Sequence, residues 1–213
     1  MDLPAYEFRE RVADALVHIL GVIAAIAGAG ILLVMVTAKG DTASIIAAAI
    51  FGFGFFASLT LSAAHNIVET KKWMPILKRT DQAAIYPLIA CAFSPFALIV
   101  VDGQISFALL TFVWLAAIAG MVLNVEPSQR FRKFSLALLV MIGWALIGAA
   151  DTVLATISKP ALNMVIACVW IFSTGLLFIR WDALPFQNAI WRIFVLLTIS
   201  CLYAAVFIEL TTP

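Results

Sequence analysis

The chain has 213 residues, of which 64% are hydrophobic and only 12% are charged. Because soluble domains carry about 25% charged residues, a water-soluble fold of this length could not bury so much apolar surface. The formal net charge of +1 gives no basic excess of the kind that a nucleic-acid-binding surface needs. The composition therefore indicates an integral membrane protein and argues against a nucleic-acid partner.

The N-terminal segment, residues 1–15, mixes charged with apolar side chains. This pattern is typical of a segment that lies at the membrane interface, and we expect it to lead into the first transmembrane helix. The remaining residues, 16–213, carry the long apolar stretches and form a single membrane domain in this interpretation.

Seven apolar stretches follow one another along the chain, separated by charged, glycine or proline residues. Each is long enough to cross a hydrocarbon core of about 30 Å at a rise of about 1.5 Å per residue. Continuous apolar runs predict helices, because strands of a membrane barrel would alternate apolar and polar residues. We therefore predict an all-α bundle of seven transmembrane helices near residues 16–37, 43–66, 82–101, 104–125, 134–156, 161–179 and 188–208.

The Lys and Arg residues set the orientation of these helices. Eleven of the thirteen fall in the N-terminal segment, in the loops after the second, fourth and sixth stretches, or just inside the seventh stretch. Only Lys39 and Lys159 fall on the other side. The positive-inside rule then places the N-terminus in the cytoplasm and the C-terminus outside, and we expect the membrane to be a bacterial inner membrane.

Polar side chains within a membrane are energetically costly, which makes them candidates for function. In this topology several lie within a turn or two of the cytoplasmic interface: His18, Ser62, His65, Asp81, Asn188 and Arg192. Structural alternatives exist. His18 and Arg192 could reach toward the interface. Ser62 could hydrogen-bond its own preceding turn, and Asp81 could cap the third helix.

Four sets of motifs stand in order along the chain. Residues 10–21 read E-R-V-A-D-A-L-V-H-I-L-G, and residues 61–65 read L-S-A-A-H. Residues 81–86 read D-Q-A-A-I-Y with A-F-S-P at 92–95, and the last set lies at 175–178, 184–186, 189–191 and 194–196. Together these motifs resemble the hemolysin III branch of the progestin and adipoQ receptor family, whose first motif reads E-x-x-A-N-x-x-T-H-x-x-G. The resemblance covers nearly the whole chain.

In that family a histidine at the end of span two and an H-x-x-x-H pair in span seven bind zinc, with an aspartate and a serine nearby. The resemblance implies a hydrolase-like site facing the inner leaflet, and relatives include alkaline ceramidases and ligand receptors. His65 keeps the span-two position. Asn188 and Arg192 stand at the span-seven positions, and Tyr203 stands where the family often has a further histidine. An arginine offers no lone pair, and its charge would repel Zn²⁺.

We therefore expect no metal cofactor at this site. We predict instead that Arg192 pairs with Asp81, while His65 and Asn188 complete a hydrogen-bond network. This arrangement favours a non-catalytic lipid-sensing, receptor-like or membrane-homeostasis role, with membrane lipids and a lipid ligand as partners.

Two alternatives stay open at this point, so enzymatic activity is undecided. A lipid amide hydrolase could use a reorganised site in which zinc is kept and Ser62, His65 and Asp81 are catalytic candidates. A pore or transporter is the weaker alternative, because the fourth and sixth stretches carry almost no polar residues.

Overall fold

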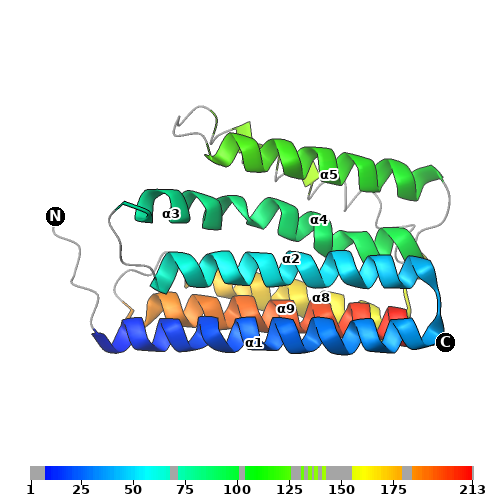
Figure 1. Cartoon of the computed structure of the whole chain (residues 1–213), viewed down its shortest axis with the longest axis horizontal. Coiled ribbons are helices and arrows are strands. Elements are labelled where there is room, and N and C mark those ends of the chain that lie inside the picture. Colours follow the sequence, from blue (N-terminus) through cyan, green and yellow to red (C-terminus); the bar gives the residue numbers. More distant parts are fainter. Residues whose placement is uncertain are drawn as a thin grey trace.

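The computed structural model describes residues 8–67, 72–100, 104–125, 131, 134–135, 137–138, 141–142, 155–178 and 184–212. Every regular element in these ranges is a helix, which confirms the predicted all-α class. The elements are α1 (Phe8–Lys39), α2 (Thr42–Ile67), α3 (Met74–Ala83), α4 (Ile85–Pro95), the π-helical turn η1 (Phe96–Val100), α5 (Gln104–Val125), α8 (Lys159–Leu176) and α9 (Gln187–Thr211). The long helices run side by side along one axis (Figure 1).

Five helical segments in the described part are long and apolar enough to cross a membrane: Val12–Lys39, Thr42–His65, Met74–Ile99, Ser106–Val125 and Gln187–Thr211. They correspond to the first four predicted stretches and the seventh. The sixth stretch corresponds to α8, an 18-residue helix that is not among these five. The fifth stretch, 134–156, falls mostly outside the described residues. The count of seven and the orientation of the termini therefore stay predictions.

The third span begins at Met74 rather than near residue 82. Pro75 lies in the first turn of α3, where its fixed φ favours a helix start and its missing N–H is no loss. Asp81 is consequently near the end of α3, so the expectation that it caps the start of the third helix is wrong. Only Ala84 separates α3 from α4, and the two helices together make one long segment.

The turn between α1 and α2 is short and well capped. Gly40 has a φ of 75°, in the left-handed region that glycine adopts without strain. The carboxylate of Asp41 accepts hydrogen bonds from the backbone N–H groups of Ala43 and Ser44, and from the Ser44 hydroxyl. The hydrogen bonds from Ser44 lower the pKa of Asp41 below its ordinary value of 3.8. This cap fixes where α2 begins and folds it back beside α1.

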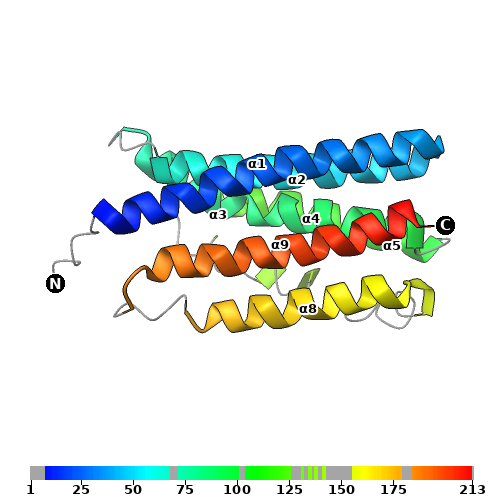
Figure 2. The ribbon, with the colours of Figure 1, turned by 90° about the horizontal axis from the view of Figure 1, so that it is seen from below.

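The packing of the helices determines which polar residues can meet. α1 lies against both α2 and α9, α8 lies beside α9, and α2 packs on α3 and α4 (Figure 2). α5 packs on the far side of α3 and α4 (Figure 1). Side chains from α1, α2, η1, α8 and α9 share one apolar core, and a second core joins α4 to α5. His18 on α1, Ser62 on α2 and Arg192 on α9 are thereby brought together.

A buried hydrogen-bond network ties α4 to α5. Tyr86 is 1% exposed and Ser135 is 0% exposed, and their hydroxyl oxygens lie 2.5 Å apart. The Ser135 hydroxyl is also 2.8 Å from the carbonyl oxygen of Gly120. Because a carbonyl only accepts, Ser135 donates to Gly120, and Tyr86 donates to Ser135. The network fixes the Tyr86 ring against the glycine.

Candidate functional site

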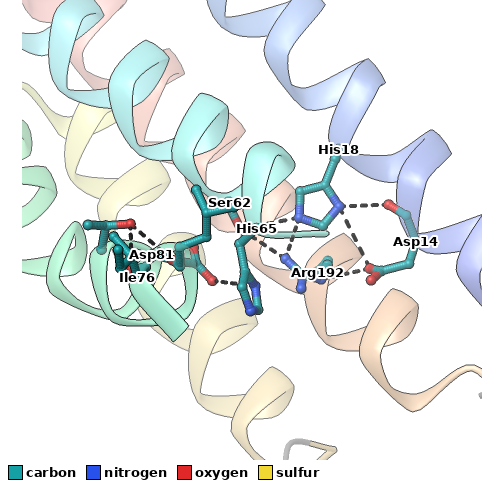
Figure 3. Close-up of polar contacts among 9 residues, drawn as sticks. Asp14, His18, Ser62, His65, Ile76, Asp81 and Arg192 are labelled. Atoms are coloured by element: carbon teal, nitrogen blue, oxygen red, sulfur yellow. Dashed lines mark hydrogen bonds and ion pairs between the residues drawn. The ribbon is translucent and has the colours of Figure 1, made fainter. Parts of the chain in front are cut away.

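Four polar side chains from three helices converge at the end of the bundle where α1 and α9 begin (Figure 3). Asp14 and His18 come from α1, Ser62 from α2 and Arg192 from α9. Asp14 is 2% exposed and His18 is 4% exposed, so the cluster is largely removed from solvent. We call these four residues the polar cluster.

Arg192 contacts all three other members of the polar cluster. Its Nε lies 2.7 Å from Oδ1 of Asp14, and its Nη1 donates to Oγ of Ser62 at 2.9 Å. The same Nη1 also donates to Nε2 of His18. The ion pair with Asp14, together with the hydrogen bonds from Nη1, offsets the cost of taking a guanidinium and a carboxylate out of water. Arg192 is therefore the centre of the cluster.

The hydrogen bonds of His18 define its tautomer. Its Nδ1 lies 2.7 Å from the backbone oxygen of Asp14, which can only accept, so Nδ1 carries the proton. Its Nε2 then carries the lone pair of a neutral imidazole and faces the donor Nη1 of Arg192. Oγ of Ser62 lies 3.2 Å from the same nitrogen. The lone pair that could bind a metal or accept a proton is thus already engaged by the guanidinium.

Local sequence explains how the polar cluster assembles. Asp14 and His18 are four residues apart on α1, and this spacing puts them on one helix face. Glu10, one turn earlier, accepts a hydrogen bond from the backbone N–H of Phe186 at 2.8 Å. Phe186 has a φ of 59° and precedes the first residue of α9. Glu10 thereby holds the start of α9 against α1 and helps to position Arg192.

A second polar contact joins α2 to α3. Nδ1 of His65 lies 3.4 Å from Oδ2 of Asp81, and their side chains are 22% and 24% exposed. The prediction that Arg192 pairs with Asp81 is therefore wrong: the carboxylate that meets Arg192 is Asp14. The reason is geometric, because α1 packs directly on α9, whereas α3 packs on α2 and α5.

The other candidates lie outside the polar cluster. Asn188 is exposed in the first turn of α9. Tyr203 lies eleven residues beyond Arg192 on the same helix, and its hydroxyl donates to the carbonyl oxygen of Gly28 at 3.0 Å. His18 is buried between the helices, and the Ser62 hydroxyl contacts His18 and Arg192 on the neighbouring helices.

Asp14 is the member of the polar cluster that sequence reasoning missed. It belongs to the N-terminal segment of mixed charged and apolar residues, which we expected to lie at the membrane interface. In the structure α1 runs without a break from Phe8 through this segment to Lys39. Its four-residue spacing from His18 is the signal that could have identified it, because such residues share one helix face.

The donor groups at this end of the bundle do not fit the zinc that the resemblance implies. Within the described residues, no three His, Cys, Asp or Glu side chains are grouped so that they could hold a metal ion. The Nε2 lone pair of His18 is engaged by a guanidinium, whose permanent charge would repel Zn²⁺ strongly in a medium of low dielectric constant. The absence of a bound metal itself remains a prediction.

Comparison with known proteins establishes the family. A profile of haemolysin-III related proteins matches residues 6–180. The chain belongs to the haemolysin-III related family. It is 30% identical over 191 residues to the Hemolysin-3 homolog of Bacillus subtilis (strain 168), covering 90% of each protein. It is 29% identical over 188 residues to Hemolysin-3 of Bacillus cereus, covering 88% of this chain and 86% of that one.

The relatives extend to animals. The chain is 24% identical over 204 residues to the human monocyte to macrophage differentiation factor, covering 93% of this chain and 83% of the human protein. These matches confirm the resemblance inferred from the motifs, and with the apolar helices they indicate an integral membrane protein. The matched profile ends before α9, so Arg192 lies beyond it.

Proposed function

We propose that this chain is a non-catalytic member of the haemolysin-III related family with a lipid-sensing, receptor-like or membrane-homeostasis role. In this proposal the guanidinium of Arg192 takes the place of the metal ion that the resemblance implies. The observation that carries it is the set of contacts from Arg192 to Asp14, His18 and Ser62. In this proposal the fixed cation, rather than a metal ion, links the three helices.

The charge balance supports this proposal. A metal ion would supply positive charge to the carboxylate and to the imidazole lone pair at the end of the bundle. Arg192 supplies one positive charge to Asp14 and a donor to Nε2 of His18. Because guanidinium is charged at every physiological pH, this support is permanent and does not depend on metal supply.

A hydrolase that uses Ser62 is the second candidate, and one distance favours it. Oγ of Ser62 lies 3.2 Å from Nε2 of His18, which is within reach for a base to accept the serine proton. A base needs a free lone pair, however, and Arg192 donates to both of these atoms. The cation therefore disfavours proton transfer to His18, and we rank hydrolysis of lipid amides below the non-catalytic role.

The proposal includes the membrane topology. Seven spans with the N-terminus in the cytoplasm of a bacterial inner membrane would put the polar cluster, His65 and Asp81 near the inner leaflet. The asymmetry of the basic residues supports this orientation.

Elemental analysis tests the proposed function together with a lipid-amide hydrolysis assay. The detergent-purified wild type is compared with the double variant Asn188→His with Arg192→His. We expect the wild type to hold no stoichiometric zinc and to release no fatty acid. We expect the double variant to gain zinc and to lose it again when His65→Ala is added. Wild-type protein that carries one zinc per chain, lost on His65→Ala, would contradict the proposal.

A further inference from the structure

A groove of about 400 Å³ lies between α1, α2 and α9. Its walls are almost entirely apolar, and its volume is in the range of small-molecule sites, about 300–1,000 Å³. Glycines on α1 let this helix approach α9 closely along the groove. A Cβ atom at Gly21 would come within 2.8 Å of the Leu196 side chain, and one at Gly28 within 3.2 Å of the Tyr203 ring.

One end of the groove meets the polar cluster on all three helices. The lining residues at this end lie within about one helical turn of a cluster residue. On α1, Leu20 and Gly21 follow His18 by two and three residues; on α2, Leu59 precedes Ser62 by three. On α9, Leu196 follows Arg192 by four. The apolar groove therefore begins next to the polar cluster.

Tyr203 closes the other end. Its hydroxyl is bound to the carbonyl oxygen of Gly28, and its ring centroid lies 6.4 Å from that of Phe51 across the groove. From Arg192 to Tyr203 the helix advances eleven residues, or about 16 Å at 1.5 Å per residue. This length is close to half of a hydrocarbon core of about 30 Å, which is the depth of one leaflet.

The groove opens sideways onto the surface that lipid would cover. Leu20, one of its lining residues, is 62% exposed. Ala24 on α1 and Ser200 on α9 also line it and are exposed. A molecule could thus enter from the bilayer without first crossing water, which points to a membrane lipid as the occupant.

Arg192 retains donors for such a molecule. Its Nε and Nη1 are used by the other members of the polar cluster, and within the described residues Nη2 is left with two N–H groups to donate. Phosphate and ester oxygens of a glycerophospholipid are acceptors that match these donors.

We propose that the groove binds one acyl chain of a phospholipid from the cytoplasmic leaflet. A headgroup or ester oxygen of the lipid accepts from Nη2 of Arg192, and Tyr203 sets the length of chain that fits. This inference rests on the proposed function, because it takes the polar cluster as a permanent, metal-free anchor for the polar end of the lipid.

Native mass spectrometry of the full chain, released from nanodiscs of phosphatidylglycerol and phosphatidylethanolamine of defined chain lengths, tests this inference. We expect one phospholipid to stay bound to each wild-type chain. Ala25→Phe fills the groove and should reduce the retained fraction at least tenfold. Ala27→Phe makes the same change at an exposed position of α1 that does not line the groove, and it should retain lipid as the wild type does.

The chain length of the retained lipid in Tyr203 variants is a second measurement, which does not depend on whether Ala25→Phe folds. Tyr203→Ala should shift the preferred lipid toward longer chains, whereas Tyr203→Phe keeps the ring and should keep the wild-type preference. The inference is overturned if Ala25→Phe, folded by its thermal unfolding profile, retains lipid as the wild type does. An unchanged chain-length preference in Tyr203→Ala, or a free fatty acid as the retained species, would also overturn it.

These outcomes can be told apart from failure of the proposed function. If the wild type holds zinc but the groove variants behave as expected, only the metal-free role fails. If the wild type is metal-free and Ala25→Phe retains lipid normally, only the lipid site fails.

Discussion

Arg192 is the residue on which the polar cluster depends most, because it contacts the three other members. A guanidinium in a medium of low dielectric constant is costly unless its charge is balanced. Asp14 supplies the opposite charge, and His18 and Ser62 both accept hydrogen bonds from Nη1. Removing one of these partners of Arg192 should therefore lower the free energy of unfolding more than a typical surface substitution does.

Asp14→Asn leaves the charge of Arg192 without its carboxylate. We expect the free energy of unfolding to fall by about 3–5 kcal/mol, the usual cost of breaking a buried ion pair. Thermal unfolding of the purified protein in detergent measures this loss. Asp81→Asn is the matched control, because Asp81 faces His65 at a site that is 24% exposed, and its effect should be much smaller. Equal effects of the two changes would show that Asp14 does not balance a buried charge.

At the scale of single helices, glycine positions decide how closely two helices approach. An added Cβ at Gly120 would lie 2.4 Å from the Tyr86 ring, and that ring is held by its hydrogen bond to Ser135. Gly30 on α1 has no atom within 4 Å of an added Cβ. The two glycines therefore differ in what they contribute to the bundle.

Gly120→Ala should lower the free energy of unfolding by about 1–3 kcal/mol, because the buried Tyr86 ring cannot move aside without strain. Gly30→Ala should leave the stability unchanged or raise it slightly, because alanine restricts the unfolded chain more than glycine does. Thermal unfolding of the two variants in one detergent compares them directly. A Gly120→Ala protein as stable as Gly30→Ala would show that α4 and α5 are not closely packed at this point.

The cap of α2 makes stability depend on acid. Hydrogen bonds from Ser44 lower the pKa of Asp41 below its ordinary value of 3.8, so the folded state favours the carboxylate. The stabilisation is present above pH 3.8 and is lost as the pH falls through the lowered pKa of the folded state. Over that acid range the melting temperature of the wild type should fall more steeply than that of Asp41→Asn, whose amide still caps α2 but does not titrate. If the melting temperatures of the two proteins fall in parallel as the pH is lowered, the Asp41 carboxylate does not contribute to the acid dependence.

Much of this element-scale structure follows from the sequence. The predicted stretch 104–125 coincides with α5, because charged residues bound an uninterrupted apolar run. The start of α3 was not predicted, because Lys78, Arg79 and Asp81 make this segment polar, as in a loop. Pro75 is the signal in the sequence that a helix starts here. The pairing of Asp14 with Arg192 depends on α1 packing against α9, and no local pattern encodes that contact.

For the whole molecule, the basic residues predict how the bundle sits in the membrane. Reporter fusions measure this orientation. A periplasmic alkaline phosphatase fused after residue 212 should be active, and one fused after residue 73, between α2 and α3, should be inactive. A green fluorescent protein fused at the same two sites should give the reverse pattern. An inactive C-terminal phosphatase with a fluorescent C-terminal reporter would contradict seven spans with the N-terminus inside.

The most direct test of Arg192 in place of a metal is the response of the wild-type protein to zinc. Thermal unfolding is measured in detergent with excess zinc and again with a strong chelator. Because a metal that binds only the folded state raises its stability by about 2.7 kcal/mol at one hundred times its dissociation constant, a functional zinc site could not escape detection. We predict the same melting temperature in both conditions. A melting temperature that rises with zinc, falls with the chelator and loses this response in His65→Ala would contradict a guanidinium-centred site.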